Sequence, residues 1–391
     1  MKAINLSKKL TTAHMHQQGM LVNLPKRCYE MKRLHIYDAG GRNSISGINA
    51  TVFGGSSVLG MVTGSMLTRM GSTCVYPYRN TSTIWDIKFK ELKPTADLGY
   101  KSFVKLQDFT NQKELSHVIR DQNVVVNCVG SHVFTQKESD FEDANIRVPM
   151  AIAKNAAANP HVKRLIHISA AGADPNSQSM RLRTKWIGEQ EVKEIFPDVT
   201  ILRPTLMLNT VDPNPTIAAK WGMQMKMFNR MNFVIEGMNA SVQPVFANDV
   251  ALAILNSLKM EETIGQTYDL GGPHTYTYED IYEQFFNLTE VKPYSVVVPL
   301  EQAYEYKQYP WFVSPYKKIF KQWLNPEFLT IESQTLHVNS ENKGFKDLNI
   351  VPISFGHKAH ELIQEITWMY NTHDVTKRDS ANNWEKKVSQ I

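Results

Sequence analysis

The sequence predicts an α/β fold in which a doubly wound parallel sheet is followed by a smaller C-terminal α/β region. Three observations predict this fold. Apolar runs alternate with helix-like stretches from residue 48 to about residue 245, which is the pattern of successive βα units. Several of these runs are apolar throughout, as in strands that are buried on both faces. The first run leads directly into a glycine turn.

The predicted strands lie at 48–53, 73–78, 100–109, 123–130, 162–172 and 199–208. Helices are predicted at 58–71, 111–122, 142–159 and from Ser179 onward, and the first ends at Gly71, a residue type that favours helix C-caps. Residues 276–391 are richer in aromatic, proline and charged residues. We therefore divide the chain into a basic N-terminal extension (1–46), a nucleotide-binding domain of the Rossmann type (47–275) and an accessory region with a polar tail (276–391).

The composition is that of an ordinary globular protein, with 391 residues, 42% hydrophobic and 21% charged. A net charge of +5 is too small to indicate nucleic-acid binding, and no aromatic RNA-binding motif or Cys/His metal spacing occurs. We predict neither a nucleic-acid partner nor a metal. The three cysteines are widely spaced, which favours a reducing compartment. The sequence contains no run of 18 apolar residues, so we predict no membrane-spanning helix.

The N-terminal extension is basic and poor in acids. Its first 33 residues contain seven lysines and arginines against one acid, Glu30. This composition resembles a mitochondrial targeting segment, and a disordered basic arm is the alternative.

The glycine turn has the spacing of a dinucleotide-binding fingerprint. Gly54 stands in the first position, where it turns the chain, and Gly60 stands in the third, where it lets the helix pack on the strand. Ser57 replaces the middle glycine and has a hydroxyl to donate to phosphate. The predicted phosphate-binding residues are Gly54, Ser56, Ser57, Val58, Leu59 and Gly60. An empty glycine turn is the alternative.

The end of the second predicted strand indicates NADP(H). An NAD site usually has an acidic residue there, about 20 residues after the glycine turn, whereas this sequence has Arg79. A guanidinium suits the 2′-phosphate of NADP(H), although Arg79 can also be a plain surface charge. Asp108 ends the third strand, where it can reach the adenine edge. Cys128, Val129 and Gly130 end the fourth strand, close to the expected adenosine ribose.

The helix predicted after the fifth strand has the lysine of a reductase site but lacks the tyrosine. Lys185 can hold the nicotinamide ribose, but the residue one turn earlier is Arg181, where many reductases have a proton-donating tyrosine. Arginine is a poor proton donor because its pKa exceeds about 12, and no tyrosine occurs from Lys101 to Thr267. Ser169 can hydrogen-bond a carbonyl. His167 is interpreted as a core residue of its strand, with a role as a base as the alternative.

Taken together, these motifs resemble the NADPH-binding accessory subunits of mitochondrial respiratory complex I, an atypical group of short-chain dehydrogenases/reductases. The resemblance covers roughly residues 40–285 and is carried by segments 40–60, 69–79, 97–100, 141–153, 165–173 and 182–192. Two departures are Ser57 in place of a glycine and Arg181 in place of a tyrosine that relatives can retain. Related reductases have an Arg-Pro pair beside the nicotinamide carboxamide, which adds Pro204 to the predicted cofactor-binding residues. Asp249 is interpreted as a helix N-terminal charge.

The resemblance implies a tightly held NADPH in a structural role, without a catalytic residue. It also implies a peripheral position at the matrix side of the mitochondrial inner membrane, near the junction of the two arms of the complex, with other complex I subunits as partners. Residues 304–328 interleave aromatic residues with lysines. This pattern suits a lipid interface, or alternatively a segment packed on the chain's own core or on a neighbouring subunit.

Two other hypotheses remain open at this stage. The chain can be a soluble NADP-dependent reductase or epimerase, or a regulator that senses NADP(H) without turnover. The tyrosine-free stretch around Arg181 favours the two non-catalytic hypotheses, and the targeting-like extension favours the complex I subunit.

Overall fold

The computed structural model describes residues 46–79, 100–131, 137–209, 231–235, 240–289, 294–298, 330, 334–338 and 341–362. The predicted targeting segment and the aromatic stretch 304–328 lie outside the described residues, apart from Ser46 at the end of the extension.

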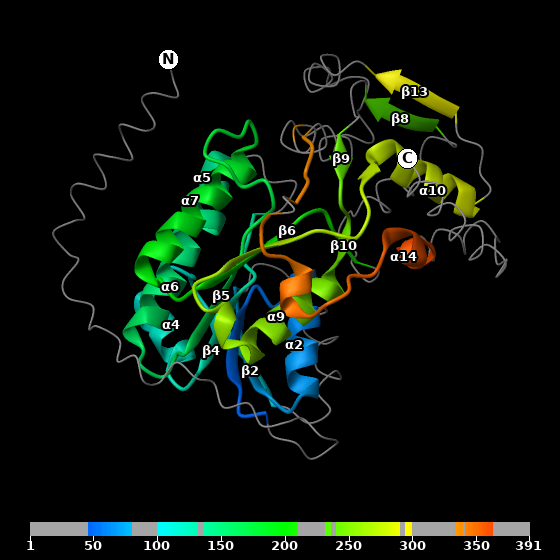
Figure 1. Ribbon diagram of the computed structural model, residues 1–391. Helices are drawn as coiled ribbons and strands as arrows, with labels where there is room; N and C mark the ends of the chain where they lie inside the picture. The colour runs from blue at the N-terminus through cyan, green and yellow to red at the C-terminus, as the bar shows by residue number, and fades with distance from the viewer. Residues whose placement is uncertain are drawn as a thin grey trace.

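A seven-stranded parallel sheet forms the centre of the fold (Figure 1). Its strand order is β11-β6-β5-β4-β1-β2-β3, and every pairing in it is parallel. The strands are β1 (Asn49–Phe53), β2 (Thr73–Arg79), β3 (Lys101–Leu106), β4 (Val124–Asn127), β5 (Arg164–Ile168), β6 (Thr200–Pro204) and β11 (Thr267–Leu270). The order reverses between β1 and β4, so ligands are expected outside the carboxyl ends of these two strands. The fold predicted from the sequence is confirmed.

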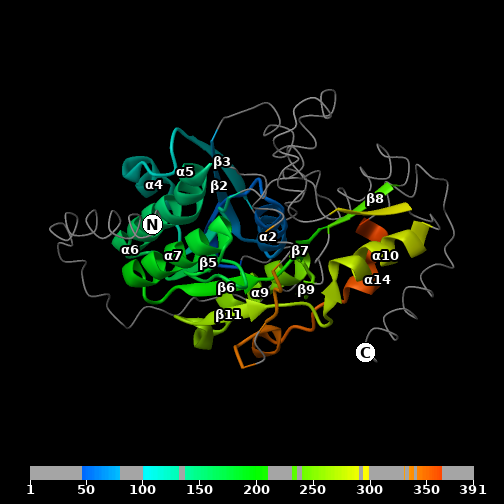
Figure 2. The same cartoon turned by 90° about the horizontal axis from the view of Figure 1, so that it is seen from above.

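Helices cover both faces of the sheet. One face carries α2 (Val58–Arg69) and α9 (Ala247–Lys259), and the other carries α4 (Gln112–Ile119), α6 (Val148–Ala158) and α7 (Met180–Ile195), as Figures 1 and 2 show. Each face has its own buried cluster of apolar side chains. The first helix ends where the sequence predicts, because Gly71 adopts a left-handed φ of 82° immediately after it.

Several predicted elements have different bounds in the structure. The strands predicted at 123–130 and 162–172 are shorter, as β4 and β5. The strand predicted at 199–208 stops at Pro204, which has no N–H to donate, and resumes as β7 (Met207–Leu208). The strand predicted at 100–109 ends at Leu106, before an Asp108–Thr110 turn. The helix predicted at 142–159 begins earlier, with α5 (Glu138–Glu142), and passes through a π-helical turn, η4 (Asp143–Arg147), into α6.

A smaller group of elements lies beside the sheet, at the right of Figure 2. It contains the strand pairs β8 (Met231–Ile235) with β13 (Tyr294–Val298) and β9 (Ser241–Val242) with β12 (Tyr276–Thr277). The helices α10 (Tyr278–Thr289) and α14 (Phe355–Leu362) pack on each other there. Between this group and the sheet lies β10 (Val245–Phe246), which pairs with β7. The short 3₁₀ turn η5 (Glu261–Thr263) follows α9 and contacts the starts of β5 and β6.

The chain returns to the main sheet after the accessory elements. The 3₁₀ turn η7 (Phe345–Leu348) and Ile350 belong to the apolar cluster on the α9 face. Asp269 N donates to Lys343 O at 2.8 Å, beside the edge strand β11. Residues 341–350 therefore complete the core of the first domain, although the sequence division at 275/276 assigns them to the accessory region.

Candidate functional site

The glycine turn brings β1 close to β4 at the point where the strand order reverses. Gly54 follows β1 with φ +77°, a conformation that favours glycine. A Cβ at this position would lie 2.8 Å from the carbonyl carbon and oxygen of Cys128. The structure thus places Gly54 against Cys128 and Val129, the residues predicted to flank the adenosine ribose.

Gly60 allows α2 to pack on its own entry turn. A Cβ on Gly60 would lie 2.2 Å from Gly54 O, which is impossible without moving backbone. Both packing roles that the spacing predicts, turning at Gly54 and close approach at Gly60, are present. The side chains of Val58 and Leu59 are buried in the core, so these two residues can offer a phosphate their backbone N–H groups at the helix N-terminus.

Ser57 has a capping role that was not identified from the sequence. It is the N-cap of α2, and its Oγ accepts a hydrogen bond from Gly60 N at 3.1 Å. The same hydroxyl donates to Gly54 O at 2.7 Å. Because a serine hydroxyl has one proton, donation to a phosphate would require breaking the bond to Gly54. Ser57 therefore stabilises the turn in which Ser56 and the free N–H groups lie.

Arg79 is the last residue of β2, and Asp108 lies two residues after the end of β3. Both are exposed, and the guanidinium carbon of Arg79 lies 5.1 Å from the centre of the Phe109 ring. Asp108 Oδ1 accepts from Thr110 N at 3.1 Å, and Oδ2 accepts from the Thr110 hydroxyl. These Thr110 bonds and the nearby Arg79 charge lower the pKa of Asp108. Phe109 was not identified from the sequence, although it directly follows Asp108.

Lys185 lies between the ends of β4 and β5. Its side chain is 5% exposed, and Nζ donates to Ile168 O at 2.9 Å and to Val129 O at 3.5 Å. An ammonium has three N–H groups, so one remains for a ligand. Gly130 leaves room for this amine, because a Cβ there would lie 3.1 Å from Nζ. Burial, and then the charge of Arg181, lower the pKa of Lys185 to about 7.

Ser169 and His167 extend this group along β5. Ser169 is 4% exposed, and its Oγ has no hydrogen-bond partner among the described residues. His167 is also buried, with Nδ1 3.1 Å from Asn127 Nδ2. Burial, and then Lys185, lower the pKa of His167 to about 3, so the imidazole is neutral at pH 7. His167 is therefore a core residue of its strand, as interpreted from the sequence.

Cys128 completes the group but is not an activated thiol. Burial raises its pKa to about 12, although the Lys185 charge acts in the opposite direction. The thiol is thus protonated at physiological pH and contributes packing rather than nucleophilic chemistry.

Asn145 is a second residue that the sequence did not reveal. It is fully buried in the π-helical turn η4, and its Oδ1 accepts from Ser131 N at 2.9 Å. Its Nδ2 donates to Ser131 Oγ and, at 2.8 Å, to Thr184 Oγ1. The loop after Gly130 is thereby tied to the first turns of α7. A helix with an insertion of this kind has no simple period in the sequence.

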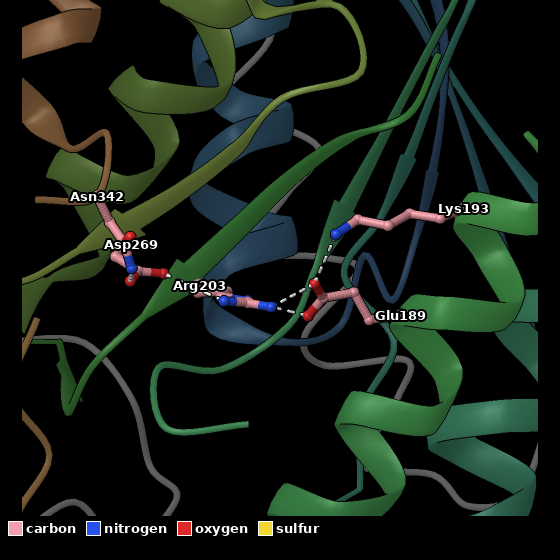
Figure 3. A network of polar contacts seen from close by, with 5 residues as sticks. All are labelled: Glu189, Lys193, Arg203, Asp269 and Asn342. Carbon is pink, nitrogen blue, oxygen red and sulfur yellow. Dashed lines mark hydrogen bonds and ion pairs between the residues drawn. The ribbon is translucent and has the colours of Figure 1, made fainter. Parts of the chain in front are cut away.

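A buried ion-pair network fixes α7 to β6, as Figure 3 shows. Glu189 is fully buried, and its carboxylate pairs with Arg203 through Oε1–Nη2 at 2.6 Å and Oε2–Nε at 3.0 Å. Lys193 adds a contact of 3.2 Å to the same carboxylate. On the other side, Arg203 Nη1 lies 3.8 Å from Asp269 Oδ1, and Asn342 Nδ2 donates to Asp269 Oδ2 at 2.6 Å. The network thus extends from α7 to the C-terminal segment.

Pro204 ends β6 beside this network and is buried. The next residue, Thr205, donates its N–H to Leu270 O at 3.0 Å. Asp249 lies in the first turn of α9 as interpreted, and its Oδ2 also accepts from Ile353 N at 2.8 Å. Its carboxylate therefore holds the chain that leads to α14.

The predicted residues gather on two sides of the carboxyl edge of the sheet. The β1–β3 side contains the glycine turn with Arg79 and Asp108, and the β4–β6 side contains Ser169, Lys185, Arg181 and Pro204. Within the described ranges, no group of histidine, cysteine or carboxylate side chains could hold a metal ion. No helix in that part of the chain is long and apolar enough to cross a membrane.

Similarity to solved structures identifies the fold. The structure of UDP-glucose 4-epimerase from Thermotoga maritima with UDP-glucose aligns with a TM-score of 0.61 and 14% identity, covering 84% of this chain and all of that one. UDP-glucuronic acid 4-epimerase from Bacillus cereus in complex with NAD aligns with a TM-score of 0.55 and 15% identity, covering 64% of this chain and 88% of that one. At such identities the likeness shows the fold alone.

Sequence comparison identifies the family. No family model matches the chain. The Arabidopsis thaliana protein named NADH dehydrogenase (ubiquinone) 1 alpha subcomplex subunit 9, mitochondrial, is 32% identical over 83% of this chain and 80% of its own length. The Rattus norvegicus protein of that name is 30% identical over 88% of each chain. The Neurospora crassa NADH-ubiquinone oxidoreductase 40 kDa subunit, mitochondrial, is 30% identical over 84% of this chain and 82% of its own. This chain therefore belongs to the family of mitochondrial complex I subunits that these proteins represent.

Proposed function

We propose that this chain is a non-catalytic accessory subunit of mitochondrial complex I that holds NADPH as a structural cofactor. The observation that carries the proposal is the buried Lys185 amine, with one N–H left over, close to the unpartnered Ser169 hydroxyl at the end of β5. Buried polar groups without partners are costly. A nucleotide lying along the carboxyl edge of the sheet would satisfy both groups.

The β1–β3 side fits the adenosine half of such a nucleotide. The turn at Gly54 and the first N–H groups of α2 suit a pyrophosphate. Arg79 suits a 2′-phosphate, and no carboxylate of the described residues lies within 4 Å of its guanidinium. These features support NADPH over NADH as the resident nucleotide.

The β4–β6 side supports binding without turnover. Bound NADPH would bring a hydride at its nicotinamide ring to this side. Lys185 would then hold the adjoining ribose and Ser169 would donate its hydroxyl, while Arg181 stands where a proton donor is needed. Holding the cofactor here would join β4, β5 and α7, and we infer that this stabilises the subunit.

The family membership supports a place in the complex. We propose that the chain binds other complex I subunits at the matrix side of the inner membrane, near the junction of the two arms, and that it supports assembly there. Contact of residues 304–328 with the lipid surface belongs to the same proposal.

Isolation of the native protein tests both parts of the proposal. Complex I would be solubilised from mitochondrial membranes and separated by native electrophoresis, and the nucleotide released on denaturation would be identified by mass spectrometry. We expect this chain in the complex I band together with NADPH. A free monomer, or a complex whose chain releases NADH or no nucleotide, would contradict the proposal.

A charge reversal at Arg79 tests the nucleotide assignment. We expect Arg79→Glu to lower the NADPH content by about 10- to 100-fold, since charge-assisted hydrogen bonds contribute about 1.5–3 kcal/mol. Arg120→Glu is the matched control, because Arg120 is exposed at the end of α4, on the opposite edge of the sheet. Equal nucleotide content in the two variants would refute the assignment of the 2′-phosphate to Arg79.

A soluble reductase or epimerase is the second candidate function. The retained Lys185 amine, with its pKa near 7, favours it, because such an amine can take part in proton transfer. The test is NADPH oxidation by the purified full chain with a panel of aldehydes and ketones. Turnover by the free chain would favour this candidate, and its absence favours the structural role.

A further inference from the structure

We propose that Phe109 is a positioning residue for Arg79 and thereby sets the preference for a 2′-phosphorylated nucleotide. The guanidinium of Arg79 lies over the Phe109 ring with 5.1 Å between its central carbon and the ring centre. This inference rests on the proposed NADPH site and adds a specificity-determining residue to it.

The Phe109 ring is a fixed platform. The residue is 6% exposed and belongs to the apolar cluster between the sheet and α4, α6 and α7. Its ring meets the ring of Phe53 edge to face, with centres 6.1 Å apart and an interplanar angle of 83°. Phe53 is the last residue of β1, directly before the turn at Gly54. The ring therefore connects the glycine turn with the end of β2.

The Phe109 ring lowers the cost of ordering the Arg79 side chain. The side chain is exposed at the last residue of β2, and a free arginine side chain loses about 2 kcal/mol of rotamer entropy when it is ordered. A stacked guanidinium is attracted through its face by the ring quadrupole. Its N–H groups lie in the guanidinium plane, so they remain available to a phosphate in a bidentate geometry.

The neighbouring carboxylate of Asp108 does not occupy the N–H donors of Arg79. Both oxygens of Asp108 accept hydrogen bonds within the turn, from the N–H and the hydroxyl of Thr110. Asp108 lies close enough to Arg79 for the charges to interact, but no ion pair within 4 Å forms between them. Asp108 therefore attracts Arg79 toward the end of β3 while Phe109 sets its orientation.

The experiment measures nucleotide preference rather than affinity alone. The nucleotide-depleted full chain would be titrated with NADPH and NADH, and with 2′,5′-ADP and 5′-AMP as probes confined to the adenosine half. In Phe109→Leu we expect the 2′-phosphorylated member of each pair to bind about three- to fivefold more weakly. The other member should change less than about twofold, because Phe109 acts on it only through general packing.

Phe196→Leu is the matched control. It removes an aromatic ring from the same apolar cluster, but Phe196 lies at the C-cap of α7, before the start of β6 and away from the end of β2. It should lower thermal stability as Phe109→Leu does, and it should leave the preference ratio unchanged. Phe109→Trp, which retains an aromatic face, should preserve the ratio. If Phe109→Leu does not fold, Phe109→Met carries the same expectation, because methionine fills irregular spaces.

A double variant separates failure of this inference from failure of the proposed function. In an Arg79→Met background, Phe109→Leu should no longer change the ratio, because there is no guanidinium left to position. If Arg79→Met abolishes the preference but Phe109→Leu leaves it intact, Phe109 is not a positioning residue and the NADPH site stands. If Arg79→Met itself leaves the preference intact, the 2′-phosphate assignment is wrong and this inference falls with it.

Discussion

The two sides of the carboxyl edge are built by different kinds of interaction. On the β1–β3 side, shape is decisive: a Cβ at Gly60 would collide with Gly54 O at 2.2 Å, and Arg79 rests on an aromatic ring. On the β4–β6 side, charge and hydrogen bonding are decisive: Lys185 is buried with a pKa near 7, and Ser169 Oγ has no hydrogen-bond partner in the part of the chain that the structure describes. The first side is defined by rigid packing. The second contains polar groups that still lack hydrogen-bond partners among the described residues.

This difference shows how a site can keep binding and lose reaction. Glycines and packed aromatic rings have no acidic proton to donate, so they can bind a nucleotide without taking part in a reaction. The reacting end of a reductase depends on one proton donor, and at that place this chain has Arg181. Under the proposed function, this single substitution removes turnover while the adenosine side is retained.

The largest expected effect is on the charge network behind the β4–β6 side. Glu189→Gln should lower the free energy of unfolding by about 3 kcal/mol, because it removes the buried partner of Arg203 and leaves the guanidinium only partly compensated. Denaturant unfolding measures the loss. The exposed Glu194→Gln on the same helix is the control. Equal, small losses in the two variants would show that the network does not hold α7 to β6.

A pair of glycine substitutions compares the two sides directly. Gly60→Ala should cost about 1–3 kcal/mol and most of the nucleotide content, because its Cβ meets backbone that cannot move away. Gly130→Ala should cost about 0.5 kcal/mol or less, because its Cβ lies 3.1 Å from the flexible end of Lys185. Thermal unfolding and nucleotide content are measured together. Equal losses would mean that the β1–β3 side is not the more rigid one.

The sequence predicted the parts of this comparison that depend on local pattern. The apolar runs indicated six strands of the sheet, and the spacing of Gly54 and Gly60 indicated the turn. A seventh strand, β11, escaped prediction, because four residues of mixed polarity have no signature until they pair with β6. Phe345 and Leu348 also escaped, because their place in the first core depends on the chain's path after the accessory elements.

Site residues escaped prediction where their role depends on distant partners. Glu189 and Arg203 lie 14 residues apart, and their pairing depends on the packing of α7 beside β6, which the sequence does not reveal. Asn145 acquires its role from a π-helical turn, which the sequence does not reveal. The capping role of Ser57 was not recognised from the sequence, although serine is a favoured residue at a helix N-cap.

The pH dependence of stability should be a property of the β4–β6 side. Lys185 has a folded-state pKa near 7, below its ordinary value of 10.5, so the unfolded chain binds more protons between these values. The free energy of unfolding of the nucleotide-free chain should therefore rise with pH from 7 to about 8.5, before the cysteines titrate. Lys185→Met should flatten this rise. Chemical denaturation at a series of pH values measures it.

Two nucleotides of different length test which side of the sheet edge causes this pH dependence of unfolding. Binding of 5′-AMP should leave the slope unchanged, because it would contact the β1–β3 side alone. NADPH should reduce the slope, because an acceptor for the third Lys185 N–H favours the ammonium form. A slope that survives in Lys185→Met would show that another group titrates in this range.

The smallest effect is expected from Arg181→Tyr, which restores the missing hydroxyl to the β4–β6 side. Arg181 is half-buried in the first turn of α7, and its charge lowers the pKa of Lys185, after burial, which is the larger cause. We expect unchanged stability and nucleotide content, with a slow NADPH oxidation by small carbonyl compounds that rises at most about 100-fold over background. The double variant Arg181→Tyr, Lys185→Met should lack this activity.

A tyrosine hydroxyl can donate its proton only to a carbonyl that is bound beside the nicotinamide. Full reductase rates in the single variant would therefore mean that the chain has also kept a substrate site. Equal rates in wild type and variant would mean that Arg181 never separated binding from reaction.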